Sequence, residues 1–179
     1  VAENCKPGNP RTEWDINADG DPAIQGFASD ISVNVGEGID FKIRTHSPRY
    51  RIDVYRMGYY GGMGARRVAT IRPSVPLTPN QPACLTDAST GLIDCGNWAE
   101  SASWAVPPDA TSGIYFAKLV RESGGTGASH VVFVARDDDG GDALAPLLVG
   151  QAHDGRVDDV VVADEHVLDL GGGDVLPAA

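Results

Sequence analysis

Between Ile24 and Arg136 the chain alternates apolar and polar residues with a period of two, and this pattern limits the fold more than any other feature. The run Tyr50-Arg51-Ile52-Asp53-Val54-Tyr55 is typical. Successive side chains of a β-strand point to opposite faces, so such a run packs one face inward and turns the other to solvent. The region shows no amphipathic helical pattern. The alternation therefore predicts an all-β fold.

About seven short strands follow from this alternation, with turn signals between them. Residues 31–35 and 39–44, on either side of Gly36-Glu37-Gly38, are predicted to be strands of the antiparallel type with one solvated face each. This number and spacing favour an immunoglobulin- or fibronectin-like β-sandwich. The predicted strands are residues 31–35, 39–44, 50–55, 68–71, 101–106, 114–121 and 130–136.

The segment Pro107–Tyr115 is similar to the turn that enters the sixth strand of such a sandwich. A tyrosine at that place often folds its hydroxyl back onto the backbone just upstream. Tyr115 is therefore the candidate for a structural tyrosine corner. The alternative is an ordinary tyrosine of the core.

Two of the three cysteines, Cys84 and Cys95, are close in sequence and lie in a segment with proline and glycine. We expect a disulfide between them, which would stabilise the chain by about 3 kcal/mol. Two free buried thiols are the alternative. Cys5 would then have no partner here, or would bond a residue outside this chain. A disulfide indicates an oxidising compartment, so we expect a secreted or extracytoplasmic protein.

Charge is distributed unevenly along the chain. Residues 1–136 hold 14 acidic and 13 basic side chains, whereas residues 137–179 hold 11 acidic side chains and Arg156 as their one base. A near-neutral body with an acidic tail argues against nucleic-acid binding, and no apolar run is long enough for a membrane span. The predicted domains are an N-terminal extended segment (1–23), the sandwich (24–136) and an acidic tail (137–179), for which a hairpin and a loosely ordered segment both stay open.

The most distinctive segment is a loop rich in glycine and tyrosine, Arg56-Met57-Gly58-Tyr59-Tyr60-Gly61-Gly62-Met63-Gly64-Ala65-Arg66. Its glycines disfavour a helix or a central strand. One hypothesis is that Tyr59 and Tyr60 stack on a sugar ring while Arg56 or Arg66 donates hydrogen bonds to it. A second is that the loop docks on a neighbouring domain. A third is a wide bend whose tyrosines cover the edge of the sandwich.

No residue set in the sequence composes a catalytic or metal site. The run Asp15–Asp21 matches the first half of a calcium-binding loop, but Gly26 stands where that loop needs its glutamate. An exposed turn stabilised by aspartate and asparagine side chains is the better interpretation. The histidines do not have zinc-site spacing. We expect no catalytic residue, no metal and no cofactor in this chain.

Several stretches together resemble a known family of secreted bacterial proteins, those related to the large (beta) subunit of N,N-dimethylformamidase. The resemblance covers roughly residues 3–138, is to the N-terminal portion of those proteins, and is most specific in the Arg-x-Gly-Tyr-Tyr-Gly-Gly run. The stretches are Glu13-Trp14-Asp15-Ile16, Ile24-Gln25-Gly26-Phe27-Ala28, Tyr50–Gly62, Asp94-Cys95-Gly96-Asn97-Trp98 and Ser112–Leu119.

This resemblance implies that catalysis belongs to a later domain, in which tyrosines and a glutamate bind a mononuclear iron. The segment after Asp142 contains no aromatic residue, so it cannot supply those tyrosines, and its composition suggests truncation or a shifted reading frame. We therefore expect a non-catalytic accessory module that packs against or positions a neighbouring catalytic domain of the parent protein. The alternatives are a carbohydrate- or cell-surface-binding module and a fragment of an iron-dependent amide hydrolase.

Overall fold

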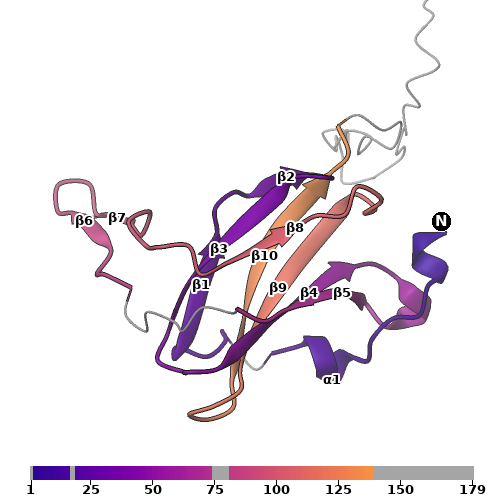
Figure 1. The fold of residues 1–179 in the computed structure, drawn as a ribbon, viewed down its shortest axis with the longest axis horizontal. Coiled ribbons are helices and arrows are strands. Elements are labelled where there is room, and N and C mark those ends of the chain that lie inside the picture. The colour runs from indigo at the N-terminus through magenta and orange to yellow at the C-terminus, as the bar shows by residue number, and fades with distance from the viewer. Residues whose placement is uncertain (1, 17–18, 74–80, 139–179) are drawn as a thin grey trace, which may run out of the picture.

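Two β-sheets make up the body of the protein in the computed structural model, which describes residues 2–16, 19–73 and 81–138 (Figure 1). The larger sheet has the strand order β2-β10-β9-β4-β5, and the smaller has the order β1-β3-β8. The strands of the larger sheet are β2 (Ser32–Asn34), β4 (Tyr50–Met57), β5 (Ala65–Ile71), β9 (Gly113–Arg121) and β10 (Ala128–Arg136). Those of the smaller sheet are β1 (Ile24–Ala28), β3 (Gly38–Thr45) and β8 (Ala102–Ala105).

The main core lies between these two sheets and confirms the predicted all-β fold. Phe41 of β3 is fully buried and meets Phe133 of β10 edge to face, with ring centroids 5.9 Å apart. Alternate residues of β3, β4, β9 and β10 fill the same core, as period-two strands require. The immunoglobulin-like subtype stays a prediction. Tyr115 is buried in this core, and its hydroxyl donates a 2.6 Å hydrogen bond to the Thr111 carbonyl, the contact expected of a tyrosine corner.

The first two predicted strands lie in different sheets, and the antiparallel type predicted for both holds only for the second. The strand predicted at 31–35 corresponds to β2, which runs parallel to β10 in the larger sheet. The strand predicted at 39–44 corresponds to β3, which pairs with β1 and β8 in the smaller sheet. The turn at Gly36, with φ of 81°, therefore carries the chain from one sheet to the other instead of closing a hairpin.

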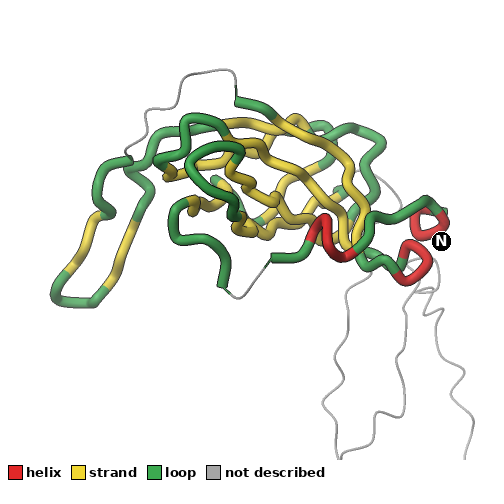
Figure 2. Tube along the Cα trace, turned by 90° about the horizontal axis from the view of Figure 1, so that it is seen from below, coloured by secondary structure: helices red, strands yellow, loops and turns green. Residues whose placement is uncertain are grey.

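A third, two-stranded sheet stands apart from the body, at the left in Figure 2. It consists of β6 (Leu85–Asp87) and β7 (Leu92–Asp94), neither of which the alternation predicted. The disulfide Cys84–Cys95 closes its base, which confirms the predicted pairing.

Within the described residues, helical structure is confined to short turns: a 3-10 helix at Glu3–Cys5, α1 (Arg11–Trp14) and a 3-10 helix at Tyr60–Gly62. No helix in the described part of the chain has the length and apolar character of a membrane span. The exposed Cys5 is free. Most of the predicted acidic tail, from residue 139 onward, lies outside the described residues, as do residues 17 and 18 of the calcium-like run.

Candidate functional site

The outer face of the five-stranded sheet, the face turned away from the core, has three zones along β9 and β10. The antiparallel register sets the pairs that form this face. The polar pair Lys118–His130 lies in the middle, with apolar pairs on either side. The four outward pairs are Val120–Ala128, Lys118–His130, Phe116–Val132 and Ile114–Val134.

The N-terminal segment covers the middle zone through its backbone carbonyls. The Lys118 ammonium donates to the carbonyl of Glu13 at 2.8 Å and to that of Asp15 at 2.9 Å. Nε2 of His130 donates to the carbonyl between them, that of Trp14, at 2.7 Å. Three consecutive carbonyls are thereby satisfied by side chains of the sheet, so residues 13–15 are fixed against it.

Aromatic packing extends this cover. The Phe116 ring stacks on Tyr55 at a centroid distance of 5.2 Å, and the tilted ring of Trp14 lies 6.3 Å from Phe116. The ring of His130 is 4.6 Å from Phe116. Tyr55 and Asp53 are each 1% exposed, although the alternation of residues 50–55 predicted a solvated face there. That prediction is wrong because the N-terminal segment lies over the face.

Two opposite charges are buried beneath the cover. Asp53 is the register partner of Lys118, and its carboxylate accepts hydrogen bonds from Thr70 at 2.8 Å and from Arg51 at 2.9 Å. Burial lowers the pKa of Lys118, and the charge of Asp53 opposes that shift. Because Asp53 and Lys118 both have hydrogen-bonding partners within the chain, this region of the face is a structural network.

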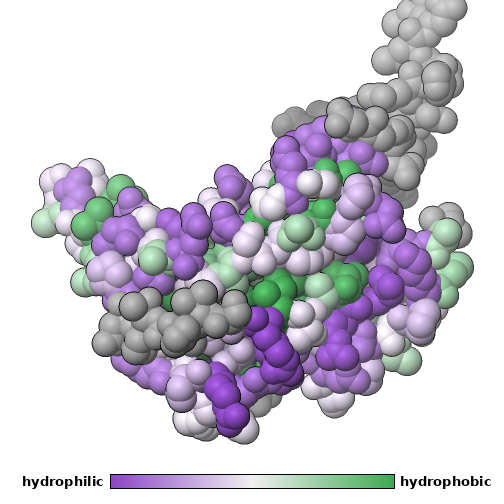
Figure 3. Space-filling model, viewed as in Figure 1, coloured by the Kyte–Doolittle hydropathy of each residue, from purple (hydrophilic) through white to green (hydrophobic). Residues whose placement is uncertain are grey.

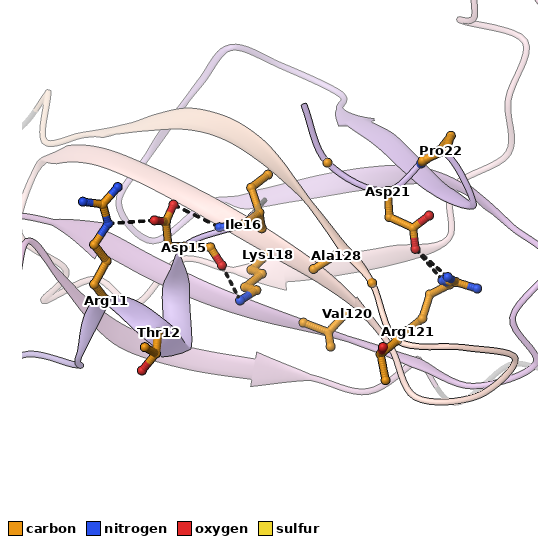
Figure 4. A pocket seen from close by; sticks show the side chains of 13 residues that line it. Arg11, Thr12, Asp15, Ile16, Asp21, Pro22, Lys118, Val120, Arg121 and Ala128 are labelled. Atoms are coloured by element: carbon orange, nitrogen blue, oxygen red, sulfur yellow. Dashed lines mark hydrogen bonds and ion pairs between the residues drawn. The ribbon is translucent and has the colours of Figure 1, made fainter. Parts of the chain in front are cut away.

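A groove of about 890 Å³ lies at the lower end of the same face (Figure 4). Charged side chains border it, and Figure 4 shows them paired with groups of the chain itself. The guanidinium of Arg121 lies 2.7 Å from the Asp21 carboxylate, and Arg11 lies 2.7 Å from Asp15. Two carboxylates of the calcium-like run, those of Asp15 and Asp21, therefore bind arginines.

The glycine–tyrosine loop, residues 56–66, closes on the N-terminal segment. Tyr60 is 2% exposed, and its hydroxyl donates to Oε1 of Glu3 at 3.0 Å while accepting from Arg56 at 3.1 Å. Arg66 lies 3.3 Å from the same Glu3 oxygen. Burial opposes ionisation of Glu3, but hydrogen bonds from Lys6 and Tyr60 hold its pKa below the ordinary value. Three of the four predicted contact residues, Arg56, Tyr60 and Arg66, are thus brought together inside the chain.

Tyr59, the fourth predicted contact residue, points away from this cluster. Its side chain is 70% exposed, and its backbone N–H donates to Oδ1 of Asn4 at 2.9 Å. The loop also needs close backbone approach, since a Cβ placed on Gly8 would lie 2.5 Å from the Cβ of Met63. Sequence reasoning missed Glu3 and Asn4 as partners, because nothing in their local sequence links them to a loop more than fifty positions away.

An apolar row lies at the foot of this loop, on the uncovered upper zone of the outer face. Arg56 is registered opposite Tyr115, so the next residue, Met57, falls beside Ile114. Across β9, Val132 is registered opposite Phe116. Met57, Ile114 and Val132 are 45%, 49% and 64% exposed. Because Val134 is opposite Ile114, Val132 is its diagonal neighbour, and the three residues form an oblique row across three adjacent strands, which we call the apolar row.

Residues 51–153 match the family model described as N,N-dimethylformamidase beta subunit-like, C-terminal. This chain belongs to the N,N-dimethylformamidase beta subunit-like family. The matched region contains the glycine–tyrosine loop and the apolar row, and it runs past residue 138, where the sequence resemblance was expected to end. Its description also places it in the C-terminal part of such subunits, whereas the sequence resemblance was to the N-terminal portion. Comparison with curated proteins found no match.

The iron that the family resemblance implies finds no suitable residues in the described part of this N,N-dimethylformamidase-like chain. A tyrosine and a glutamate, the residue types expected to bind the iron, do meet in this part of the chain: Tyr60 contacts Glu3. The oxygens of this pair are already bonded to Arg56, Arg66 and Lys6. Three cations around these three oxygens, the Tyr60 hydroxyl and the two carboxylate oxygens of Glu3, disfavour a metal ion there. Across residues 2–16, 19–73 and 81–138, no cluster of three or more His, Cys, Asp or Glu side chains could hold a metal.

Proposed function

We propose that this chain is a non-catalytic accessory module of an exported N,N-dimethylformamidase-like protein, and that it packs against and positions a catalytic domain. The observation that carries the proposal is the apolar row of Met57, Ile114 and Val132. Single exposed apolar residues are common on protein surfaces, but adjacent ones on neighbouring strands are typical of interaction sites.

The contrast between two zones of one sheet face supports this role. Around Phe116 the N-terminal segment covers the face, and the ring is 4% exposed. Val132, its register partner, is left 64% exposed. Burying an aliphatic side chain of this size stabilises an interface by roughly 1.5–3 kcal/mol. A partner domain that covers the apolar row, as the N-terminal segment covers Phe116, would gain this burial free energy at each of the three residues.

The row is well suited to positioning because its backbone is rigid. Ile114 belongs to β9, which is hydrogen-bonded to β4 on one side and to β10 on the other. At the end of β4, the Arg56 guanidinium donates to the Ser112 carbonyl at 2.9 Å and ties the loop to the start of β9. Tyr59 is exposed on that loop, and in this proposal it contacts the same partner.

Two further features bear on location and on the alternatives. The Cys84–Cys95 disulfide supports an oxidising compartment and hence export. The carbohydrate hypothesis relied on stacking by two tyrosines, but Tyr60 is buried and its hydroxyl is bonded within the chain. We therefore propose a protein domain as the partner.

The test is binding to a separately produced catalytic portion of an N,N-dimethylformamidase beta subunit, measured by titration calorimetry. Val132→Lys places a charge in the apolar row and should weaken binding by about tenfold or more. Ser103→Lys, at an exposed position of the opposite sheet, is the matched control and should leave binding unchanged. Absence of binding by the wild-type chain, or equal losses in both variants, would refute the proposal.

The hydrolase alternative has its own assay. Purified chain is loaded with ferrous iron, its bound metal is quantified, and its hydrolysis of N,N-dimethylformamide is followed. We expect no stoichiometric iron and no turnover. Iron-dependent turnover by this chain alone would replace the accessory role with a catalytic one.

A further inference from the structure

The two-stranded sheet of residues 84–95, which we call the arm, projects from the body and exposes three large aliphatic side chains (Figures 1 and 2). Every residue of β6 and β7 is exposed. Leu85, Leu92 and Ile93 are 59%, 63% and 67% exposed, and Figure 3 shows hydrophobic surface on the arm, at the left of the view. An isolated hairpin of this kind is at best marginally stable in water, so something must hold it and something should explain its apolar surface.

Covalent and hydrogen bonds hold the arm in shape at both ends. The disulfide Cys84–Cys95 closes the base. At the tip, the Asp87 carboxylate accepts from the backbone N–H of Ser89 at 2.8 Å, and the Asp87 carbonyl accepts from Gly91 at 2.8 Å. The shape therefore exists before any partner binds, which reduces the entropy lost on binding.

The base of the arm is fixed to the body as well. The Trp98 indole is 7% exposed, donates to the Pro82 carbonyl at 3.0 Å and packs against Phe27 of β1 at 5.7 Å. Asn97 donates to the Ala83 carbonyl at 2.9 Å. The arm thus has a defined direction relative to the sandwich, which a flexible loop would lack.

The register of the arm determines what shape of partner it fits. Leu85 is opposite Asp94 and Leu92 is opposite Asp87, so these four side chains share one face. Ile93 is opposite Thr86 and lies on the other face. A flat partner surface would bury the leucines or the isoleucine, but not both. A cleft with two walls would bury all three.

Charge determines the chemistry of one wall. Both aspartates of the arm, Asp87 and Asp94, lie on the leucine face, and residues 84–95 contain no lysine or arginine. Each carboxylate already accepts a backbone hydrogen bond, Asp87 from Ser89 and Asp94 from Gly96, but its negative charge would still need a cationic partner when an interface buries it. The wall that faces the leucines should therefore carry arginine or lysine beside its apolar surface.

We propose that the arm inserts into a two-walled apolar cleft of the catalytic domain, with basic groups on the wall that meets Leu85 and Leu92. This inference rests on the proposed accessory function, because it names a second contact with the same partner. The apolar row would set one face of the module against the catalytic domain, and the arm would clamp it.

The experiment uses the full chain and the same separately produced catalytic portion of an N,N-dimethylformamidase beta subunit. Leu85→Ser/Leu92→Ser removes one apolar face and Ile93→Ser removes the other, and each should weaken binding by about tenfold. Ala88→Ser, at the exposed tip, is the matched control and should bind as the wild type does. All four proteins should show the same circular dichroism, because the arm lies outside the core.

Two more variants test charge and shape. Asp87→Asn/Asp94→Asn keeps an acceptor oxygen for each turn while removing the charge, so its binding should be weaker at low salt and should depend less on salt. Cys84→Ser/Cys95→Ser should weaken binding by loosening the arm.

The outcomes separate the two proposals. If the wild type does not bind, both fail. If Val132→Lys reduces binding while every arm variant binds normally, the arm inference alone fails. A loss confined to one face of the arm would overturn the cleft and indicate a flat surface. Self-association of the chain in analytical ultracentrifugation that disappears in the arm variants would make a second copy the partner, and would overturn the inference too.

Discussion

The imidazole of His130 donates a 2.7 Å hydrogen bond to the backbone carbonyl of Trp14, and this contact joins β10 to a segment 116 residues earlier in the chain. A carbonyl only accepts, so Nε2 carries the proton. The ring also packs against Phe116 at 4.6 Å. The N-terminal segment is consequently part of the folded body, which its predicted extended character did not indicate.

His130 should make the stability of the protein depend on pH. Burial lowers the pKa of His130 below its ordinary value of 6.5, although the bond to Trp14 and the charge of Asp15 oppose this and Lys118 adds to it. The folded chain therefore binds this proton less readily than the unfolded chain. The stability conferred by the neutral ring is complete above the ordinary pKa and declines as the pH falls below it.

Urea unfolding at about pH 7.5 and about pH 5.5 measures this effect. Wild type should lose stability between the two values. His130→Gln keeps an N–H donor for Trp14 but does not titrate, so its loss should be smaller. Equal losses in the two proteins would show that His130 does not contribute.

Lys118→Met should release the N-terminal segment. The substitution leaves the carbonyls of Glu13 and Asp15 without their donor and leaves Asp53 beside an apolar group. We expect a loss of about 2–4 kcal/mol in the free energy of unfolding. Hydrogen exchange should show reduced protection at residues 13–16, whereas Arg44→Met, at an exposed position, should change neither quantity.

Loss of the hydroxyl should lower the stability of the protein at one of the two adjacent tyrosines of the loop and leave it almost unchanged at the other. Tyr60→Phe breaks the link between Arg56 and Glu3, which should cost about 1–3 kcal/mol. Tyr59→Phe removes a hydroxyl from a side chain that is 70% exposed, so stability should change by less than about 0.5 kcal/mol. Thermal unfolding of the pair measures both, and equal shifts would contradict the buried role of Tyr60.

Alanine substitutions should separate two different reasons for glycine in this region. Gly61 has φ of 66° with open space around its Cβ position, so Gly61→Ala should cost about 1 kcal/mol through backbone strain alone. Gly8→Ala would place a Cβ 2.5 Å from Met63 and 2.7 Å from Tyr60, so it should displace the N-terminal segment and cost more. Chemical denaturation ranks the two, and a larger effect at Gly61 would contradict the packing.

The alternation gave the central strands correctly because each of them packs one face in the main core. Residues 114–121 were predicted and correspond closely to β9. Alternation cannot reveal what covers the second face. Asp53 and Lys118 look like solvated positions in the sequence, and both are buried because a distant segment lies over them. The alternation did not predict the strands of the arm for another reason. Each of them has three residues, which is too short to show a period of two.

Part of the candidate site was accessible from sequence and part was not. Glycine content and paired tyrosines drew attention to residues 56–66, which do lie beside the apolar row. Their composition does not tell which tyrosine is buried, since that depends on Glu3, a residue from the other end of the domain. No local sequence pattern marked Val132 as part of a contact surface. An outward-facing valine on a strand can be assigned to such a surface only when the positions of the neighbouring strands are known.

The cover over the sheet also constrains the order in which the molecule can be built. Trp14 is synthesised before β9 and β10, the strands whose side chains it contacts in the folded protein. Residues 3–9 can dock on the loop of residues 56–66 earlier, but residues 13–15 lack the side chains that bind them until β9 and β10 have been synthesised. Contacts of such long sequence separation form slowly and leave apolar groups open to aggregation in the meantime. Residues 13–15 are therefore made before the strands that fix them, and they dock late in folding.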